Sequence, residues 1–217
     1  MRLHQATLLI LIATAAVLKP APVAAQAPTE EVIYPAIPLA ALESYQASIF
    51  DEPLESMRMP RLRLTGPRTL TMDIIPGHNA VPTQGECSAR FEITNAPDFK
   101  VEFFSFPAAR FGFELDDTTL NLYLKGLSLS HTPEQAFKII EESAFDENGP
   151  AKFRVLGQRA MTVRYSYQIE ERTLVYGENW IERGGTIYIV RVIAPQRTFE
   201  LQFQDVRVVF NSISEQE

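Results

Sequence analysis

The chain has 217 residues, of which 46% are hydrophobic and 22% charged, a composition typical of a globular domain. Its formal charge is −7 at pH 7, from 27 acidic and 20 basic residues. An acidic surface is repelled by nucleic acid and by anionic lipid headgroups, so neither is expected as a partner.

The first segment, residues 1–25, has the features of a secretory signal peptide. Arg2 precedes an apolar run of about thirteen residues, which is shorter than the roughly twenty that a transmembrane helix needs. This short run favours cleavage over an uncleaved anchor. The small residues Val23 and Ala25 favour a cut after Ala25, since a cut after Ala27 would leave Pro28 directly after it. Removal of this segment leaves 18 basic and 27 acidic residues, a formal charge of −9. We therefore expect a periplasmic or secreted protein that is not stably inserted in a membrane.

Residues 26–60 differ in composition from the rest of the chain. They are rich in proline and poor in aromatic residues, which is typical of an extended leader or linker. Within them, Leu42, Tyr45 and Ile49 have the spacing of one short amphipathic helix over residues 39–50. That helix could dock on a partner or pack loosely on its own domain. A single α+β domain is expected over residues 61–217.

Alternating apolar and polar side chains predict several strands at the start of this domain. Leu62 and Leu64, for example, alternate with Arg61 and Arg63. The run around Phe103 is dense in aromatic residues, which favours a sheet core over a ligand-binding platform. The expected strands span residues 61–64, 70–75, 88–94 and 99–106, with a polar loop over residues 76–85.

The middle of the chain is expected to contain a strand followed by a helix. Residues 120–124 alternate leucine with Asn and Tyr and predict the strand. Thr132 and Gln135 then have the spacing of a capping box, with Pro133 at the first helical position, so a helix is expected from Pro133 to Ser143.

The C-terminal part predicts an antiparallel meander closed by a helix. A period of two recurs in three long runs, and Gly184-Gly185 is typical of a tight hairpin turn between the last two. The three strands are expected over residues 161–169, 173–183 and 186–194. The closing helix has an apolar stripe of Phe199, Phe203, Val206 and Phe210.

This order of elements resembles the PsbP-like superfamily over residues 88–213. That group includes photosystem extrinsic subunits, a nuclear-import accessory protein that binds a small GTPase, and bacterial periplasmic proteins and lipoproteins. The resemblance is carried by the capped segment 132–143, Gly157-Gln158-Arg159-Ala160, and residues 184–188 and 209–213. It implies an antiparallel sheet flanked by helices, and an accessory or assembly role without catalytic residues. Two features depart from it: residues 26–68 have no counterpart, and no lipid-anchor cysteine follows the apolar run.

The residues that could carry chemistry are few. Cys87 is the only cysteine, so the core must form without an internal disulfide. It could be a redox thiol, an intermolecular bridge or an inert buried side chain, and the absence of a Cys-x-x-Cys motif favours the last. Trp180 could be an interface hot spot or a core residue, and its place in a strand favours the core.

No metal, cofactor or catalytic signature is apparent. His78 and His131 are expected on separate loops and lack the pairing of zinc ligands. The carboxylate pairs at residues 116–117 and 141–142 lack the alternate spacing of a calcium loop, which favours a solvated turn and a solvated helix face. We assign no catalytic, metal or cofactor-binding residue and expect no cofactor.

Two functions of different classes remain open. The first is a non-enzymatic accessory module that binds another envelope protein through a sheet face or through the leader. The second is a small-molecule-binding protein or a hydrolase whose site is assembled from scattered residues such as His78, Asp116 and Arg164.

Overall fold

The structure, a computed structural model, describes residues 36–50, 60–94, 96–112, 114–143, 154–155 and 158–215. Within these ranges the chain forms an α+β fold of antiparallel sheets flanked by helices, as the sequence predicts. The expected signal peptide, its cleavage site and the first part of the leader lie outside them. None of the helices in these ranges is long and apolar enough to cross a membrane.

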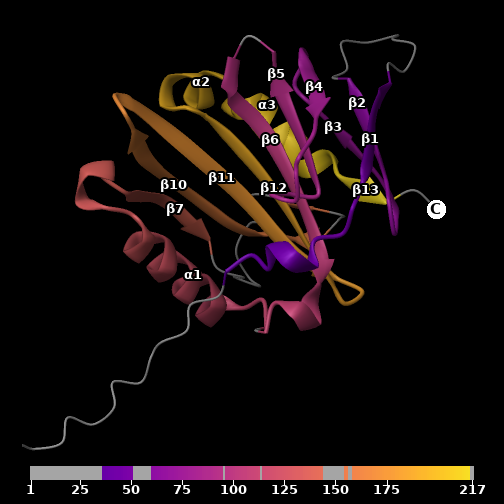
Figure 1. Cartoon of the computed structure of the whole chain (residues 1–217), viewed down its shortest axis with the longest axis horizontal. Helices are drawn as coiled ribbons and strands as arrows, with labels where there is room; N and C mark the ends of the chain where they lie inside the picture. The colour runs from indigo at the N-terminus through magenta and orange to yellow at the C-terminus, as the bar shows by residue number, and fades with distance from the viewer. Residues whose placement is uncertain are drawn as a thin grey trace, which may run out of the picture. The chain divides into compact units, whose positions relative to one another are not determined.

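The larger sheet has seven strands, and every neighbouring pair is antiparallel (Figure 1). In spatial order they are β4 (His78–Val81), β5 (Ala89–Ile93), β6 (Ala96–Pro107), β12 (Thr186–Pro195), β11 (Arg172–Arg183), β10 (Met161–Ile169) and β7 (Lys138–Ser143). The predicted meander is confirmed as β10, β11 and β12. Gly184 and Gly185 turn the chain between the last two with φ angles of 58° and 75°, a left-handed conformation that favours glycine.

A second antiparallel sheet contains four strands. In spatial order they are β1 (Gln46–Phe50), β2 (Arg61–Thr65), β3 (Thr69–Asp73) and β13 (Ser214–Glu215). Strand β2 has the predicted alternation, because Leu62 and Leu64 are fully buried whereas Arg63 is exposed. A separate ribbon pairs β8 (Arg154–Val155) with β9 (Gln158–Arg159).

Three α-helices and three short 3₁₀ turns complete the described ranges. The helices are α1 (Asp117–Ser130), α2 (Gln196–Leu201) and α3 (Phe203–Ser212), and the turns are η1 (Leu39–Ala41), η2 (Ala108–Arg110) and η3 (Pro133–Gln135). The predicted closing helix is divided into α2 and α3, because Gln202 leaves the helical conformation at φ −103° and ψ 17°. Its apolar stripe is buried as expected at Phe199, Val206 and Phe210.

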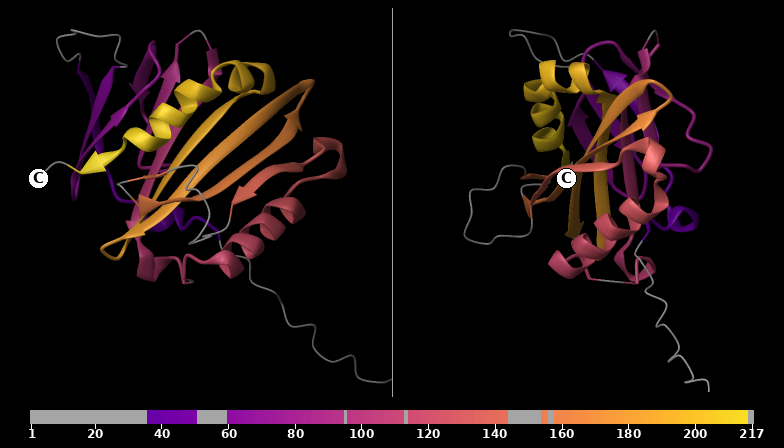
Figure 2. Two further views of the ribbon diagram at one scale, coloured as in Figure 1. Left: turned by 180° about the vertical axis from the view of Figure 1, so that it is seen from behind. Right: turned by 90° about the vertical axis from the view of Figure 1, so that its left-hand side faces the viewer.

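Two hydrophobic cores lie on opposite faces of the larger sheet. The first is enclosed by the four-stranded sheet and by α2 and α3, which lie along one face of the larger sheet (Figure 2). The second lies under α1 and contains Trp180. Because successive strand residues point to opposite faces, Ile181 and Trp180 belong to different cores. Each fully buried aliphatic or aromatic side chain contributes about 1.5–3 kcal/mol.

The prediction of a helix from Pro133 to Ser143 is wrong. Only the turn η3 forms, with the Gln135 side-chain oxygen accepting a hydrogen bond from Thr132 N at 2.9 Å. Ala136 then adopts a φ of 46°, and the chain continues as β7, paired with β10. Pairing of β7 with β10 therefore overrode the capping signal, as tertiary contacts commonly override local propensity.

The prediction of a strand over residues 120–124 is also wrong, because these residues belong to α1. Asp116 caps this helix, and its carboxylate accepts a hydrogen bond from Thr119 N at 2.7 Å. Leu120, Tyr123 and Leu124 are buried, which is a helical spacing. The alternating leucines covered too few residues to separate a period of two from a period of 3.6.

The prediction of a helix over residues 39–50 is wrong as well. Its first residues form only η1, and its last residues form β1, which pairs with β2. Tyr45 packs edge-on against Phe103, with ring centroids 5.3 Å apart. The predicted loop over residues 76–85 likewise contains a strand, β4. Both strands were missed because each depends on a partner elsewhere in the chain.

Candidate functional site

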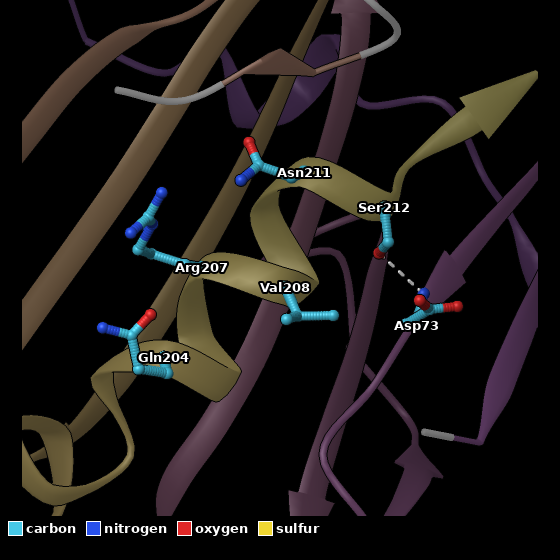
Figure 3. Close-up of a pocket in the computed structure, with 6 residues that line it drawn as sticks. All are labelled: Asp73, Gln204, Arg207, Val208, Asn211 and Ser212. Atoms are coloured by element: carbon cyan, nitrogen blue, oxygen red, sulfur yellow. Dashed lines mark hydrogen bonds between the residues drawn. The ribbon is translucent and has the colours of Figure 1, made fainter. Parts of the chain in front are cut away.

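A shallow cavity of about 420 Å³ lies beside α3 and opens to solvent (Figure 3). At one end, Asp73 N donates a hydrogen bond to Ser212 Oγ at 2.8 Å, which ties β3 to the end of α3. The Asp73 carboxylate lies 3.3 Å from Nε of Arg61. The cavity is lined by Asp73, Gln204, Arg207, Val208, Asn211 and Ser212. It offers charged and amide groups beside one aliphatic side chain.

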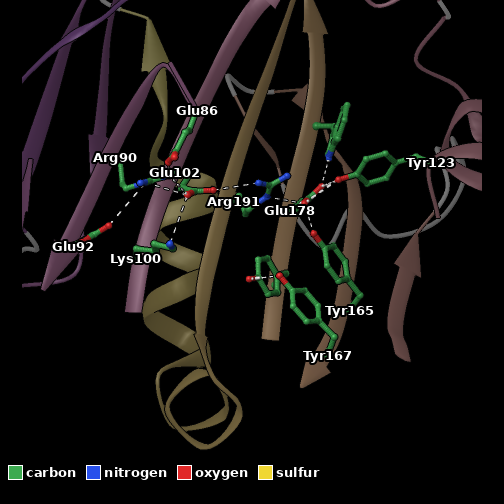
Figure 4. A network of polar contacts seen from close by, with 12 residues as sticks. Glu86, Arg90, Glu92, Lys100, Glu102, Tyr123, Tyr165, Tyr167, Glu178 and Arg191 are labelled. Atoms are coloured by element: carbon green, nitrogen blue, oxygen red, sulfur yellow. Dashed lines mark hydrogen bonds and ion pairs between the residues drawn. The ribbon is translucent and has the colours of Figure 1, made fainter. Parts of the chain in front are cut away.

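A second concentration of polar groups lies on the α1 face of the larger sheet and is centred on Glu178 of β11 (Figure 4). Glu178 is fully buried, and its two carboxylate oxygens accept hydrogen bonds from four side chains. The donors are the Tyr123 hydroxyl at 3.0 and 3.1 Å, the Tyr165 hydroxyl at 2.9 Å, Trp180 Nε1 at 2.8 Å and Arg191 Nε at 2.8 Å. These contacts occupy the acceptor sites of the carboxylate.

Arg191 extends this network across the sheet. Its Nη1 donates to Glu102 of β6 at 3.2 Å, and its guanidinium lies 4.7 Å from the centre of the Phe104 ring. Glu102 in turn lies 3.0 Å from Nη2 of Arg90 in β5, which is 2.6 Å from Glu86. The result is a row of alternating charges that runs from the buried Glu178 to the solvent-facing Glu86.

The electrostatics of the network favour a structural ion pair. Burial alone would lower the pKa of Arg191, but the neighbouring carboxylates, Glu178 above all, raise it well above its ordinary value. Burial, reinforced by Glu178, raises the pKa of the Tyr123 and Tyr165 hydroxyls. These groups therefore stay as a guanidinium and two neutral phenols near pH 7. The four donors hold the Glu178 carboxylate in one position inside the core.

Aromatic rings continue from this network towards the end of α1. Tyr165 stacks on Tyr176 with centroids 5.1 Å apart, and Tyr176 stacks on Tyr167 at 4.9 Å. The Tyr167 hydroxyl donates to the Tyr176 hydroxyl at 2.6 Å. His131, which follows α1, packs against Tyr167 at 4.3 Å and stacks on Phe137 at 4.8 Å. These contacts hold the end of α1 against the sheet.

Two exposed apolar side chains, Ile139 and Ile140, lie in the strand at one edge of the larger sheet. Strand β7 is the last strand in the sheet order, and among the described residues it pairs only with β10. Two residues of β7 lie opposite one residue of β10 next to Tyr165, which is a β-bulge and changes the direction of the side chains there. Ile139 and Ile140 at this bulge are 39% and 41% exposed, Ile169 at the end of β10 is 37% exposed, and Leu129 in the last turn of α1 is 65% exposed.

The three residues considered for a scattered site do not come together. His78 lies in β4 and Arg164 in β10, five strand spacings apart, which is roughly 24 Å at about 4.8 Å per spacing. Asp116 caps α1 on the second-core side, whereas Arg164 lies over the Phe203 ring at 5.2 Å on the first-core side. No site is assembled from these side chains.

The other sequence candidates have structural surroundings. Cys87 is buried as expected, and this burial raises the pKa of its thiol to about 12, which disfavours the reactive thiolate. Trp180 is a core residue, as expected. His78 is buried against Phe99 instead of lying in a loop. The carboxylates at residues 141–142 lie in β7, not on a helix, and their side chains are outside the described part of the structure.

Sequence reasoning missed the residues of the charge network. Glu178 stands between Tyr176 and Trp180 at positions that share one face of a strand, and Arg191 stands between Ile189 and Ile193 in the same way. A charged residue in phase with buried neighbours is rare unless it is paired. This phase was visible in the sequence, although the pairing of Glu178 with Arg191 required the strand register.

Comparisons with known proteins give structural likenesses at low identity. No family model matches the chain, and no curated protein matches it. The crystal structure of LpqN, involved in cell envelope biogenesis of Mycobacterium tuberculosis, aligns at 10% identity with a TM-score of 0.44, covering 80% of this chain and 92% of that one. The solution structure of the cyanobacterial PsbP, CyanoP, from Synechocystis sp. PCC 6803 aligns at 12% identity with a TM-score of 0.47, covering 78% and 92%. These identities are too low to transfer a function or a partner.

Proposed function

We propose that this chain is an exported, PsbP-like accessory module that binds another envelope protein and does not catalyse a reaction. The observation that carries the proposal is the apolar edge, defined as Ile139, Ile140 and Ile169. Of the seven large apolar side chains exposed in the described ranges, Ile139 and Ile140 lie in β7 and Ile169 ends the neighbouring strand β10. Exposed apolar side chains gathered at one place commonly mark an interaction site.

The charge network supports a binding role over a catalytic one. Glu178 accepts hydrogen bonds from Arg191, Tyr123 and Tyr165. These buried polar groups therefore hold α1 and the sheet together. The sequence resemblance is supported in part. The hairpin at residues 184–188 and the helix end near residues 209–213 form as expected, whereas the segment 132–143 does not form a helix.

The charges beside the apolar edge indicate what kind of partner would fit. Glu170 and Glu171, at the turn that follows Ile169, are both exposed. The exposed Lys138, which precedes Ile139 in β7, adds a basic group. A partner surface with apolar groups flanked by charges of both signs would complement this edge.

The proposal is tested by affinity purification of the chain from the envelope fraction of its own cell. The test variant is the double substitution Ile139→Ser and Ile140→Ser. The control is Leu201→Ser, which removes an even more exposed apolar side chain, 77% exposed, from α2. We expect one stoichiometric partner with the unmodified chain and with the control, and its loss with the double variant. Recovery that is unaffected by the double variant would place binding elsewhere, and recovery of no partner would count against an accessory role.

A further inference from the structure

We infer that the cavity beside α3 binds the free C-terminal carboxylate of a peptide chain. This goes beyond the proposed function and does not depend on the apolar edge. Side chains four residues apart form rows along a helix, with grooves between neighbouring rows. Arg207 and Asn211 form one row on α3, and Gln204, Val208 and Ser212 form the next. The groove between these rows is the floor of the cavity.

The two rows differ in chemistry. Figure 3 shows Arg207 and Asn211 projecting to one side of α3 and Val208 to the other. In the described part of the chain the Arg207 side chain forms no ion pair and the Gln204 side chain forms no hydrogen bond, so both polar ends are available to a ligand. A guanidinium presents its donors in a fork that matches the two oxygens of a carboxylate. Arg207 therefore selects an anionic, planar group.

The charges also orient the ligand. Asp73, at the Ser212 end of the groove, would repel a carboxylate, even though Arg61 partly neutralises it. The carboxylate is therefore placed at the end nearest Arg207 and Gln204. The preceding residues of the peptide run towards Asp73, where a backbone N–H or a basic side chain is favoured.

Val208 distinguishes a chain terminus from an acidic side chain. It follows Arg207 in the helix and is 42% exposed, so an apolar group of the ligand can pack on it next to the guanidinium. The last residue of a peptide carries its side chain on the atom beside the carboxylate, whereas the side chain of Asp or Glu has no apolar branch there. The cavity volume of about 420 Å³ is within the ~300–1,000 Å³ that is usual for small-ligand sites.

The test is a titration of the ¹⁵N-labelled chain with acetyl-Lys-Val-Leu, followed by two-dimensional ¹H–¹⁵N NMR. One arm uses the peptide with a free C-terminal carboxylate, and the other uses the same peptide with a C-terminal amide. The test variant is Arg207→Gln, and the matched control is Arg197→Gln, which removes an exposed arginine from α2, outside the cavity. Both positions are exposed, so each variant should keep the dispersed spectrum of the folded chain.

We expect the free-acid peptide to shift the side-chain amide signals of Gln204 and Asn211 and the backbone signals of residues 204–212. The amidated peptide and Arg207→Gln should each bind at least about tenfold more weakly, because a charge-assisted pair of hydrogen bonds is lost. Arg197→Gln should bind as the unmodified chain does. Equal binding of the acid and the amide, unchanged binding by Arg207→Gln, shifts on another surface, or no shifts at millimolar peptide would each overturn the inference. None of these outcomes bears on the apolar edge.

Discussion

Glu178 is a charged residue at a core position, and its hydrogen-bond donors come from four different elements. Tyr123 belongs to α1, Tyr165 to β10, Trp180 to β11 and Arg191 to β12. A buried ion pair contributes little net stability compared with apolar residues of the same size, but loss of one partner leaves buried groups unpaired. The network is therefore expected to be sensitive to single substitutions.

Glu178→Ala is expected to lower the free energy of unfolding by about 3–5 kcal/mol, because it leaves the mostly buried Arg191 side chain, 16% exposed, without its closest carboxylate. Unfolding in guanidinium chloride measures this loss. The matched control is Glu92→Ala, at the outer end of the network, where Glu92 lies 3.9 Å from Arg90. This long, partly exposed pair should contribute only about 0–1 kcal/mol. Equal losses for the two variants would show that burial does not decide the effect.

His78 is expected to make folding stability depend on pH. Its Nδ1 lies 2.8 Å from the Ile75 carbonyl oxygen, and burial lowers the pKa of its imidazole below the ordinary 6.5. The unfolded chain therefore binds a proton at a higher pH than the folded chain does. This contribution to stability is complete above pH 6.5 and is lost as the pH falls below it.

His78→Leu removes this titration and should flatten the dependence of the unfolding midpoint on pH between about 7 and 5. The measurement is the denaturant midpoint at a series of pH values, with the unmodified chain in parallel. An identical slope for both chains would mean that other groups cause the dependence.

Among the elements, the short turn η3 illustrates how one residue redirects the chain. Ala136 has a φ of 46°, in the left-handed region that residues with a Cβ rarely adopt. Glycine occupies this region without a steric penalty, although it gives the unfolded chain more freedom. The strained residue therefore lies in the connection between η3 and β7.

Ala136→Gly is expected to raise the free energy of unfolding by about 0.5–1 kcal/mol, because relief of the left-handed strain exceeds the entropic cost of glycine. Ala80→Gly is the matched control, since Ala80 is an exposed residue within β4 and glycine in a strand costs about 0.5–1 kcal/mol. The two variants should therefore move the thermal midpoint in opposite directions. Destabilisation by both would show that the conformation of Ala136 carries no strain.

At the scale of the whole molecule, residues 36–50 join the two cores. Ile37 and Leu42 pack against the second core, whereas Tyr45 packs against the first. Between them Glu43 is anchored to β6, because its N–H donates to the Ser105 carbonyl at 2.8 Å and its carboxylate accepts from the Ser105 hydroxyl. This segment belongs to the fold as well as to the expected leader.

A chain that starts at Met59 is therefore expected to be markedly less stable than one that starts at Ala36, because it lacks β1 and the packing of Tyr45 on Phe103. Thermal unfolding followed by circular dichroism compares the two directly. Equal midpoints would show that residues 36–58 add nothing to stability. A stability loss would also mean that truncation at Met59 cannot test the leader for binding, which is why the substitutions in β7 are the better test.

Features that depend on residues close together in the sequence were predictable, whereas features that depend on contacts between distant residues were not. Strand β2 was predicted because Leu62 and Leu64 alternate within one short run. The capping box at Thr132 was also a correct local signal, but it stabilises only the single turn η3. The residues that follow pair with β10 as a strand. The apolar edge was not foreseen, because Ile139 and Ile140 were assigned to a helix.

The sequence by itself determined the antiparallel meander, the hairpin at Gly184-Gly185 and the apolar stripe of the terminal helices, because each follows from a periodicity or a turn within adjacent residues. Only the tertiary structure decided that residues 138–143 form a strand paired with β10, that β1 pairs with β2, and that Glu178 meets Arg191. These features depend on strands brought together from distant parts of the chain. Burial and strand pairing contribute more free energy than local propensity does, so they prevail wherever the two conflict.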